Sequence, residues 1–429
     1  MFTSYAKRAV CILAGLSVAC GQSVTTLSLA QAEQLALRNH PKLASAALSA
    51  QAARRVVDQA RSAYQPTVSA TVTTTDALEG TAVASGALTT SSLSTRFASG
   101  MNLLQLVTDF GRTSHLVRSA RLRAEAADAG VANVRASVLL QVRLAYFSAL
   151  GSEAVRKAAQ AALDSRRLSL RQVTALSRSA LKSTLDVSFA QVLVSEAELS
   201  VYQAENNAAE SEAQLTAALG LAQTQHFNLI DQPAPGPLNP DLQESIEEAS
   251  RIRPDLNQLR RTSDAAEEYA RAERKLRFPT VDVIGAAGAI PEHDPTLPHD
   301  NYGAAGLNIN IPVFNGGLFA SRRAEAALRS QAAAKDVQDL FVQIAREVQD
   351  EWLEANTAYR RLSVTAQLVD QANQALHLAQ ARYDAGLGSI VELNQAQLAQ
   401  TSAEIDAASA KYDYLSARAS LDYATGALH

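Results

Sequence analysis

The longest stretch without a helix breaker constrains this chain most strongly. No proline or glycine occurs between Leu318 and Ala385, and alanine and other good helix formers dominate that stretch. At 1.5 Å per residue, about 67 residues of helix span roughly 100 Å. Because this length far exceeds that of a helix in an ordinary globular domain, the sequence predicts an elongated helical structure.

Apolar residues follow a seven-residue spacing along this stretch, and small residues dominate a second series between them. A sustained seven-residue repeat with small partner positions predicts a coiled-coil seam. The first series is Phe341, Val348, Ala355, Leu362, Val369, Leu376 and Tyr383, and the second is Ile344, Glu351, Ala358, Thr365, Ala372 and Ala379.

The second half of the chain repeats the first half. Pro41 and Pro66 stand in the same local sequence as Pro254 and Pro279, at an offset of 213 (254 minus 41). Later pairs share an offset of 206 (317 minus 111), so the first half has a longer excursion between these anchors. A unit of about 200 residues is too long for a solenoid repeat and indicates a duplicated half-protein. The later pairs are Gly111 and Gly317, Tyr146 and Trp352, Asp186 and Glu392, Ala190 and Ala396, Gln191 and Gln397, and Gly220 and Gly426.

Each half predicts one order of elements: a helix, two strands, a long helix and a shorter return helix. Prolines begin and end the first helix of each half, and β-branched or alternating apolar residues mark the strands. In the first repeat, 27–232, we expect a helix over 41–64, strands over 67–75 and 95–108, and helices over 112–178 and 184–219. A proline-rich linker, 233–240, precedes the second repeat, 241–429, with a short helix over 241–252, a helix over 254–278, strands over 280–290 and 302–313, and helices over 317–384 and 390–425.

The four strands are long enough to cross a bilayer as tilted strands. Aromatic residues near their ends suit the girdle found at membrane interfaces. Four strands cannot close a barrel, and open edges cannot face lipid. We therefore expect a barrel shared between chains: two copies give 8 strands and three give 12, and only the wider barrel leaves room for a passage. The aromatic residues are Tyr64, Phe97, Phe110, Phe278, Tyr302 and Phe314.

Composition narrows the function classes. The formal net charge of -4 argues against a nucleic-acid binder. The two cysteines, Cys11 and Cys20, exclude a disulfide scaffold and a cysteine-rich metal site. Lys7, Arg8 and the apolar run that follows predict an export signal over 1–22. Cleavage near Cys20 is the first interpretation, and lipid attachment to Cys20 is the alternative.

The ordered motifs resemble the TolC-like outer-membrane efflux proteins. The resemblance covers the chain from about Leu27 to its end and is most telling over Arg382–Leu393, which reads RYDAGLGSIVEL. It implies a mainly helical subunit of a homotrimer, in which a 12-stranded barrel in outer-membrane lipid continues into a periplasmic α-barrel. The expected partners are a periplasmic adaptor and an inner-membrane pump of an efflux or type I secretion system, and no cofactor is expected.

The resemblance also implies roles for residues at the two breaks between long and return helices. Tyr383, Glu392 and Asp186 match gate positions, while Gln395 stands where a second acid often lies. A ring of carboxylates repeated three times would attract cations, and the plainer interpretation of Glu392 is a carboxylate at a helix N-terminus. The tips expected to meet the adaptor are Ala385, Gly386, Leu387 and Gly388 in the second half, and Ala180, Leu181 and Lys182 in the first.

Two rival classes remain: a soluble or exported coiled-coil scaffold without channel activity, and an exported enzyme. The scaffold explains the long helices but not the export signal or the four long strands. Thr108–Gly111 contains a kinase-like DFG without the accompanying kinase motifs, and the scattered histidines lack ligand spacing. His293 and His299 share a loop with several acids, for which a polar external loop is the preferred interpretation over a metal site. We predict no catalytic site.

Overall fold

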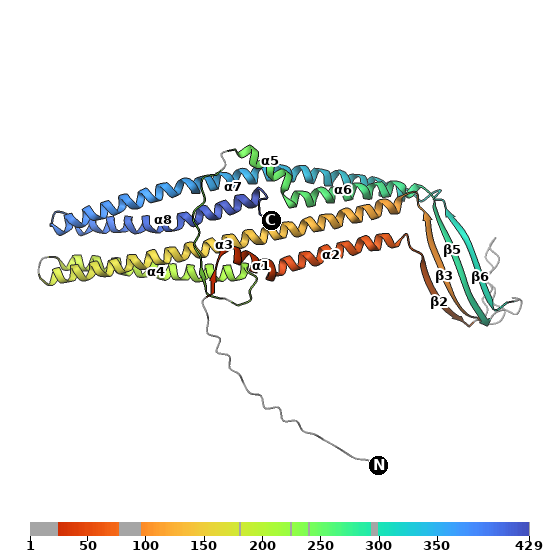
Figure 1. The fold of residues 1–429 in the computed structure, drawn as a ribbon, viewed down its shortest axis with the longest axis horizontal. Coiled ribbons are helices and arrows are strands. Elements are labelled where there is room, and N and C mark those ends of the chain that lie inside the picture. The colour runs from red at the N-terminus through yellow and green to blue at the C-terminus, as the bar shows by residue number, and fades with distance from the viewer. Residues whose placement is uncertain are drawn as a thin grey trace, which may run out of the picture.

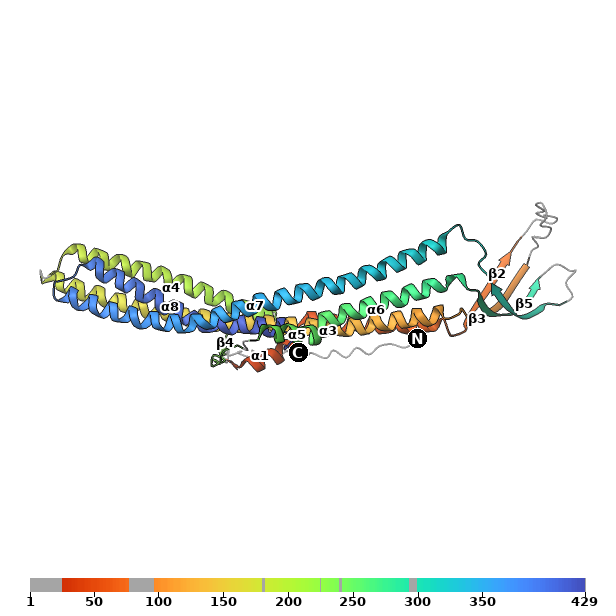
Figure 2. The same ribbon diagram turned by 90° about the horizontal axis from the view of Figure 1, so that it is seen from above.

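The computed structural model describes residues 25–76, 96–179, 182–223, 225–238, 241–292 and 299–428. The export signal over 1–22, Cys20, Thr95, Ala180, Leu181, the end of the linker at 239–240 and His293 lie outside the described residues. The described chain is elongated: helices run side by side along most of its length, and a small sheet bends away at one end (Figures 1 and 2).

The two long helices have the same length. Helix α3 spans Arg112–Arg178 and helix α7 spans Leu318–Asp384, each with 67 residues. The return helices α4, Thr184–Ala218, and α8, Ile390–Ala424, have 35 residues each. Both return helices end one residue before their expected limits, and α7 begins one residue after its expected start.

Shorter helices and strands complete the order. Helix α2, Pro41–Ser62, and helix α6, Pro254–Arg274, are shorter than expected, and a 3-10 turn, η1, Lys275–Arg277, follows α6. Helix α5, Leu242–Ile252, follows the linker. The sequence analysis missed helix α1, Leu29–Asn39, and the paired strands β1, Thr25–Leu27, and β4, Phe227–Leu229.

Four antiparallel strands form one sheet in the order β2–β3–β5–β6. They are β2, Thr67–Thr75; β3, Arg96–Thr108; β5, Thr280–Glu292; and β6, Asn301–Asn310. Strand β5 is two residues longer than expected. Strand β6 ends before Ile311 and Val313, because Pro312 lacks the N–H needed to continue a ladder. Strands β2 and β6 form the two edges of this sheet, and neither has a second strand neighbour among the described residues.

A left-handed glycine makes the turn from strand to long helix in both halves. Gly111 precedes α3 with φ 90°, and Gly317 precedes α7 with φ 86°. The two return helices also end alike, at Gly220 with φ 73° and Gly426 with φ 80°. Because glycine lacks a Cβ, it adopts this backbone without strain. These glycines set the same chain reversals in each half.

The helices pack in the spatial order α4, α3, α8 and α7 along the half of the bundle away from the sheet (Figure 1). The largest core cluster of the described residues lies near the middle of the long axis. There the buried Tyr146 hydroxyl on α3 donates to the Leu27 and Ile230 carbonyls and accepts from the Ile230 amide, and these hydrogen bonds fix β1 and β4 to the bundle. Along α7, both seven-residue series contain buried residues. In the series of small residues every member except Glu351 is buried, whereas in the other series only Val348, Ala355 and Tyr383 are. Phe341 departs from the expected seam, since it is 45% exposed in the single chain.

Candidate functional site: the paired hairpin tips

The reversal from α7 to α8 forms the first of two tips. Gly386 takes φ 73°, and the amides of Leu387 and Gly388 both donate to the Arg382 carbonyl, at 2.8 and 3.0 Å. Ser389 then caps α8 by accepting from the Glu392 amide at 3.1 Å. These local bonds make a tight turn that leaves Leu387 74% exposed at its apex.

The reversal from α3 to α4 is capped differently. Ser183 and Asp186 form a capping box at the start of α4, in which the Ser183 amide donates to the Asp186 carboxylate at 3.3 Å. Asp186 therefore has the helix-capping role that its position favours, in addition to any role in a gate. The expected contact residues Ala180 and Leu181 lie outside the part of the chain that the structure describes.

The two tips meet at Tyr383. Its ring is buried against Val173, Ile390 and Leu393. From the other tip, the Lys182 ammonium donates to the Tyr383 carbonyl at 2.7 Å and lies 3.6 Å from the centre of the ring. This combination of hydrogen bond and cation–π contact joins the end of α7 to the start of α4.

The Tyr383 hydroxyl is buried beside a carboxylate. Burial first, and then the negative charge of Asp186, raise the pKa of Tyr383 to about 12. The hydroxyl makes no hydrogen bond of ordinary geometry to the described residues. A buried donor without a well-aligned partner costs free energy, so a small approach of Asp186 would stabilise this contact.

Glu392 forms an ion pair inside its own hairpin. The Arg382 guanidinium lies 3.0 Å from the Glu392 carboxylate, and both side chains are about half exposed. The pair resembles an ordinary surface salt bridge, whose free energy is small. Gln395 points to solvent on α8 and is not brought into the contact of Tyr383 with Lys182.

The structure brings together Tyr383, Asp186 and Lys182, and it places Glu392 beside them through Arg382. The sequence analysis assigned Lys182 only to an exposed tip and gave Arg382 no role. Arg382 lies in the last turn of α7, where the helix dipole favours a cation, whereas Lys182 lies just before the N-cap of α4, where it does not. The helix-end signal therefore identifies Arg382 alone, and it does not predict that Glu392 is its partner or that Lys182 reaches Tyr383 on the other hairpin.

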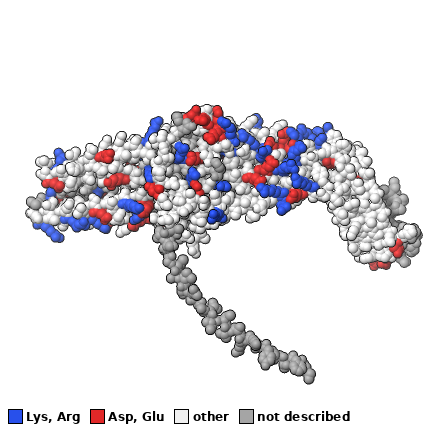
Figure 3. All heavy atoms as spheres, viewed as in Figure 1, with Lys and Arg blue, Asp and Glu red and all other residues white. Residues whose placement is uncertain are grey.

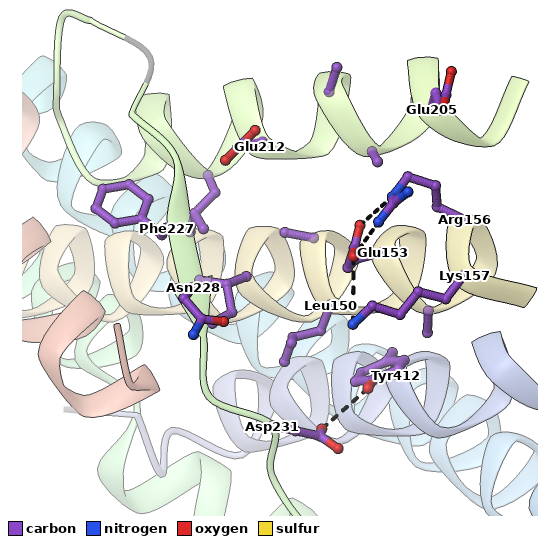
Figure 4. Close-up of a pocket in the computed structure, with 16 residues that line it drawn as sticks. Leu150, Glu153, Arg156, Lys157, Glu205, Glu212, Phe227, Asn228, Asp231 and Tyr412 are labelled. Carbon is purple, nitrogen blue, oxygen red and sulfur yellow. Dashed lines mark hydrogen bonds and ion pairs between the residues drawn. The ribbon is translucent and has the colours of Figure 1, made fainter. Parts of the chain in front are cut away.

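A cavity lies far from the tips, between α3, α4 and the segment around β4 (Figure 4). It has a volume of about 650 Å³. Glu153 on its wall turns toward Arg156 and Lys157, at 2.7 and 3.6 Å, and Asp231 bonds Tyr412 at 3.2 Å. These pairs offset much of the charge on the cavity wall; the Glu205 carboxylate and the Asn228 amide also line it.

No group of three or more metal-ligating side chains occurs within the described ranges. The same residues contain no helix that is both long and apolar enough to cross a membrane.

Two helical hairpins, each with a 67-residue and a 35-residue helix, thus meet at their tips, and among the described residues they carry a four-stranded sheet at the opposite end. The sequence profile of the family described as outer membrane efflux protein matches residues 32–221 and 245–427, and the chain belongs to this family. Outer membrane protein TolC of Escherichia coli K12 is 23% identical over 453 residues, which cover 99% of this chain and 87% of that protein.

Solved channels share the fold. The outer-membrane channel OprN superposes with a TM-score of 0.80 at 21% identity, covering 93% of this chain and 89% of that one. The outer membrane protein VceC of Vibrio cholerae gives a TM-score of 0.78 at 21% identity, covering 93% and 96%. The expected fold class is therefore confirmed as that of the TolC-like channels. The family to which the chain belongs consists of outer-membrane channel proteins rather than enzymes.

Proposed function

We propose that the chain is one subunit of a homotrimeric conduit that carries cargo passively from the periplasm to the exterior. The observation that carries this proposal is the four-stranded sheet with open edges at β2 and β6. Its strands have 9 to 13 residues, near the length that spans a bilayer when tilted. Because open edges are not tolerated in lipid, the edges β2 and β6 of successive copies pair and close a 12-stranded barrel.

The exposed apolar residues of the helices support a ring of copies. They gather on α4 and α7, which lie on opposite flanks of the bundle half away from the sheet (Figure 1). Contact between different surfaces of successive copies generates a closed ring when the rotation closes. In the trimer, α7 of one copy packs beside α4 of the next. The exposed residues are Leu185, Phe189, Val192, Leu199 and Tyr202 on α4, and Leu353, Val364, Leu368 and Leu378 on α7; α7 also exposes Leu328, Phe341 and Val342 nearer the sheet.

The tips are proposed to contact a periplasmic adaptor, through which an inner-membrane pump delivers cargo in an efflux or type I secretion system. Ala385, Gly386 and Leu387 are exposed at the end of a hairpin about 100 Å from the sheet. An exposed Leu387 at such an apex suits contact with an apolar residue of a partner helix. The efflux description of the family supports this assignment.

The paired tips are proposed to form the gate of the conduit. Contact of Lys182 and Asp186 with Tyr383 holds the two hairpins of one subunit together, and the Arg382–Glu392 pair holds the second reversal. When the Arg382–Glu392 pairs separate, three copies of Glu392 near the axis form a negative ring that attracts cations. Opening requires the α7–α8 hairpin to move away from α3 and α4.

Fractionation and conductance test the conduit against the scaffold alternative. The full-length protein is expected in the outer-membrane fraction as a detergent-stable oligomer, and the purified oligomer is expected to conduct ions across a planar bilayer. A soluble monomer without conductance would support the coiled-coil scaffold and contradict the proposal.

Replacing the gate carboxylate tests the negative ring. We expect Glu392→Gln to weaken block of single-channel conductance by divalent cations by about tenfold, since each trimer loses three charges. Glu325→Gln removes another partly exposed, ion-paired carboxylate, near the other end of α7, and serves as the control. Unchanged block in Glu392→Gln would contradict the placement of this residue at the constriction.

A further inference from the structure

The ends of the sheet that face the helices carry a concentration of positive charge. Within six residues of these strand ends, the chain has Arg61 before β2, Arg112 after β3, and Arg274, Lys275 and Arg277 before β5. The sheet itself is almost free of charge, and Lys and Arg gather over the helices where they meet it (Figure 3). The described ends on the opposite side carry Asp76, Glu292 and Asp300, together with Arg96.

The nearby acids are already used inside the protein. Asp109 is buried and accepts from the amides of Gly111 and Thr113, at 3.1 and 2.6 Å. The Glu273 side chain, only 1% exposed, faces Arg112 and Arg322, at 3.6 and 2.8 Å. These acids therefore do not neutralise the remaining cations at the surface.

Four cations remain, and we call them the basic collar: Arg61, Arg274, Lys275 and Arg277. None of the four forms an ion pair with a carboxylate of the described chain. Arg61, Arg274 and Arg277 are exposed, and Lys275 is half-buried. Strands β2 and β5 both pair with β3, so both begin at the end of the sheet that faces the helices. The register places Thr67 level with Ile284, so β5 begins four residues nearer the helices than β2.

An aromatic pair lies at the same level as the collar. Phe110 and Phe278 stack with ring centres 5.6 Å apart, directly where β3 ends and β5 begins. The Lys275 ammonium and the Arg277 guanidinium lie 5.2 and 5.0 Å from the centre of the Phe278 ring. Cationic heads beside an apolar ring suit the boundary between lipid headgroups and acyl chains, where long basic side chains reach toward the polar layer.

We propose that the basic collar binds the phosphate headgroups of anionic phospholipids in the periplasmic leaflet of the outer membrane. The proposal rests on the proposed function, because it takes the sheet to be the membrane-spanning part. Arginine recognises phosphate with two parallel hydrogen bonds, and clusters of Lys and Arg beside a membrane span attract anionic lipid. The difference in charge between the two ends of the sheet would then orient the protein in an asymmetric membrane.

The test compares lipids bound to the full-length oligomer after reconstitution into nanodiscs of phosphatidylcholine containing about one phosphatidylglycerol in five. Native mass spectrometry measures the ratio of phosphatidylglycerol to phosphatidylcholine retained by the protein. We expect enrichment of phosphatidylglycerol in the wild type. The enrichment should fall at least tenfold in the triple variant Arg274→Gln, Lys275→Gln, Arg277→Gln. Each cation near an anionic surface contributes roughly fivefold in lipid affinity, and screening by salt reduces the combined effect.

A matched triple variant, Arg251→Gln, Arg346→Gln, Arg360→Gln, removes three exposed cations elsewhere on the helices and should keep the wild-type enrichment. Glycerol 3-phosphate in solution should not displace the lipid, since the headgroup alone lacks the acyl chains that hold it at the aromatic pair. Equal enrichment in the collar variant and the control, or displacement by glycerol 3-phosphate, would overturn the assignment to membrane lipid.

Two further measurements separate the possible failures. If the collar variant does not fold, raising salt from about 0.1 to about 0.5 M with wild-type protein must reduce the enrichment, because binding is electrostatic. Unchanged enrichment there contradicts the proposal. Conductance in pure phosphatidylcholine tests the proposed channel separately: a conducting protein without lipid preference refutes only the collar, whereas loss of conductance in every bilayer refutes the channel.

Discussion

Helices α3 and α7 have the same length and equivalent positions in the two halves, yet they are buried very differently. Helix α3 packs against α1, α2, α4, α6 and α8, whereas α7 packs against α5, α6 and α8. Among the described residues of α3, Leu168 is the one large hydrophobic that is exposed. Helix α7 exposes such residues along its whole length, from Leu318 to Leu378. Of two helices in equivalent positions, one is thus packed on most sides within the chain, and the other keeps an exposed apolar face, which the proposed trimer would cover.

The same contrast applies to the tips. The reversal after α7 has Gly386 and a buried Tyr383, whereas the aligned position before the other reversal is Ser177. The first-half tip instead contributes Lys182 and Asp186, which act on Tyr383. The two halves therefore share backbone geometry but contribute different residues to one contact: the second half provides Tyr383, and the first provides Lys182 and Asp186.

The largest expected effect comes from charging the exposed face of α7. The double variant Val364→Asp, Leu368→Asp places two carboxylates on side chains that are 61% and 44% exposed in the single chain. If α7 packs on a neighbouring copy, the loss is about 3 kcal/mol or more at each interface. We expect monomers in light scattering of detergent-solubilised protein.

The matched change on α3 is Leu168→Asp, at the exposed position of that helix. It should leave the oligomer intact, because this residue lies outside the flanks formed by α4 and α7. An oligomer that survives the α7 double variant would contradict the division of roles between the two helices.

Truncating the aligned aromatic residues of α3 and α7 should lower the free energy of unfolding by different amounts. Tyr146→Ala removes a fully buried ring and its bonds to Leu27 and Ile230, and we expect a loss of about 3–5 kcal/mol. Trp352→Ala, at a half-buried site, should cost about 1–2 kcal/mol. Chemical denaturation of both variants, followed by circular dichroism, measures the difference. Equal losses would mean that burial does not distinguish the helices.

The repeating elements were predictable from the sequence because local signals define them. Glycines precede both α3 and α7 and another follows α7, and the seven-residue spacing marks the inner faces. Helix α1 and the strand pair β1–β4 were missed, since three-residue strands carry little pattern and their pairing depends on contacts with distant Tyr146. The expected end of β6 at residue 313 was too late, because Pro312 has no N–H to donate to a neighbouring strand.

The site was predictable only as a set of positions. Tyr383, Glu392 and Asp186 were identified from the sequence, and their roles in a gate stay a prediction. The contact of Lys182 with Tyr383 joins residues 201 positions apart, so no local pattern indicates it. The Arg382–Glu392 pair depends on the compact turn at Gly386, which brings the last turn of α7 to the first turn of α8.

Removing the ammonium that joins the tips should test their division of chemistry. Lys182→Met keeps the length of the side chain but removes the hydrogen bond and the cation–π contact, together about 1–2 kcal/mol. We expect the closed channel to open more often, with a roughly tenfold higher open probability in planar bilayers. Lys157→Met, which removes an exposed lysine of α3 away from the tips, is the control. An unchanged open probability in Lys182→Met would show that this contact does not restrain the gate.

The smallest effect is expected where the halves are most alike. Gly111→Ala and Gly317→Ala each place a side chain on a left-handed residue with open space around its Cβ position, so backbone strain is the main cost. Each variant should lose about 1 kcal/mol of stability, and the two losses should agree, because the turn before α3 and the turn before α7 have the same geometry. Thermal unfolding of the two variants, followed in parallel, measures this agreement. A clear difference between the two losses would mean that the different packing of α3 and α7 also affects the stability of the turns that precede them, although the two turns have the same backbone geometry.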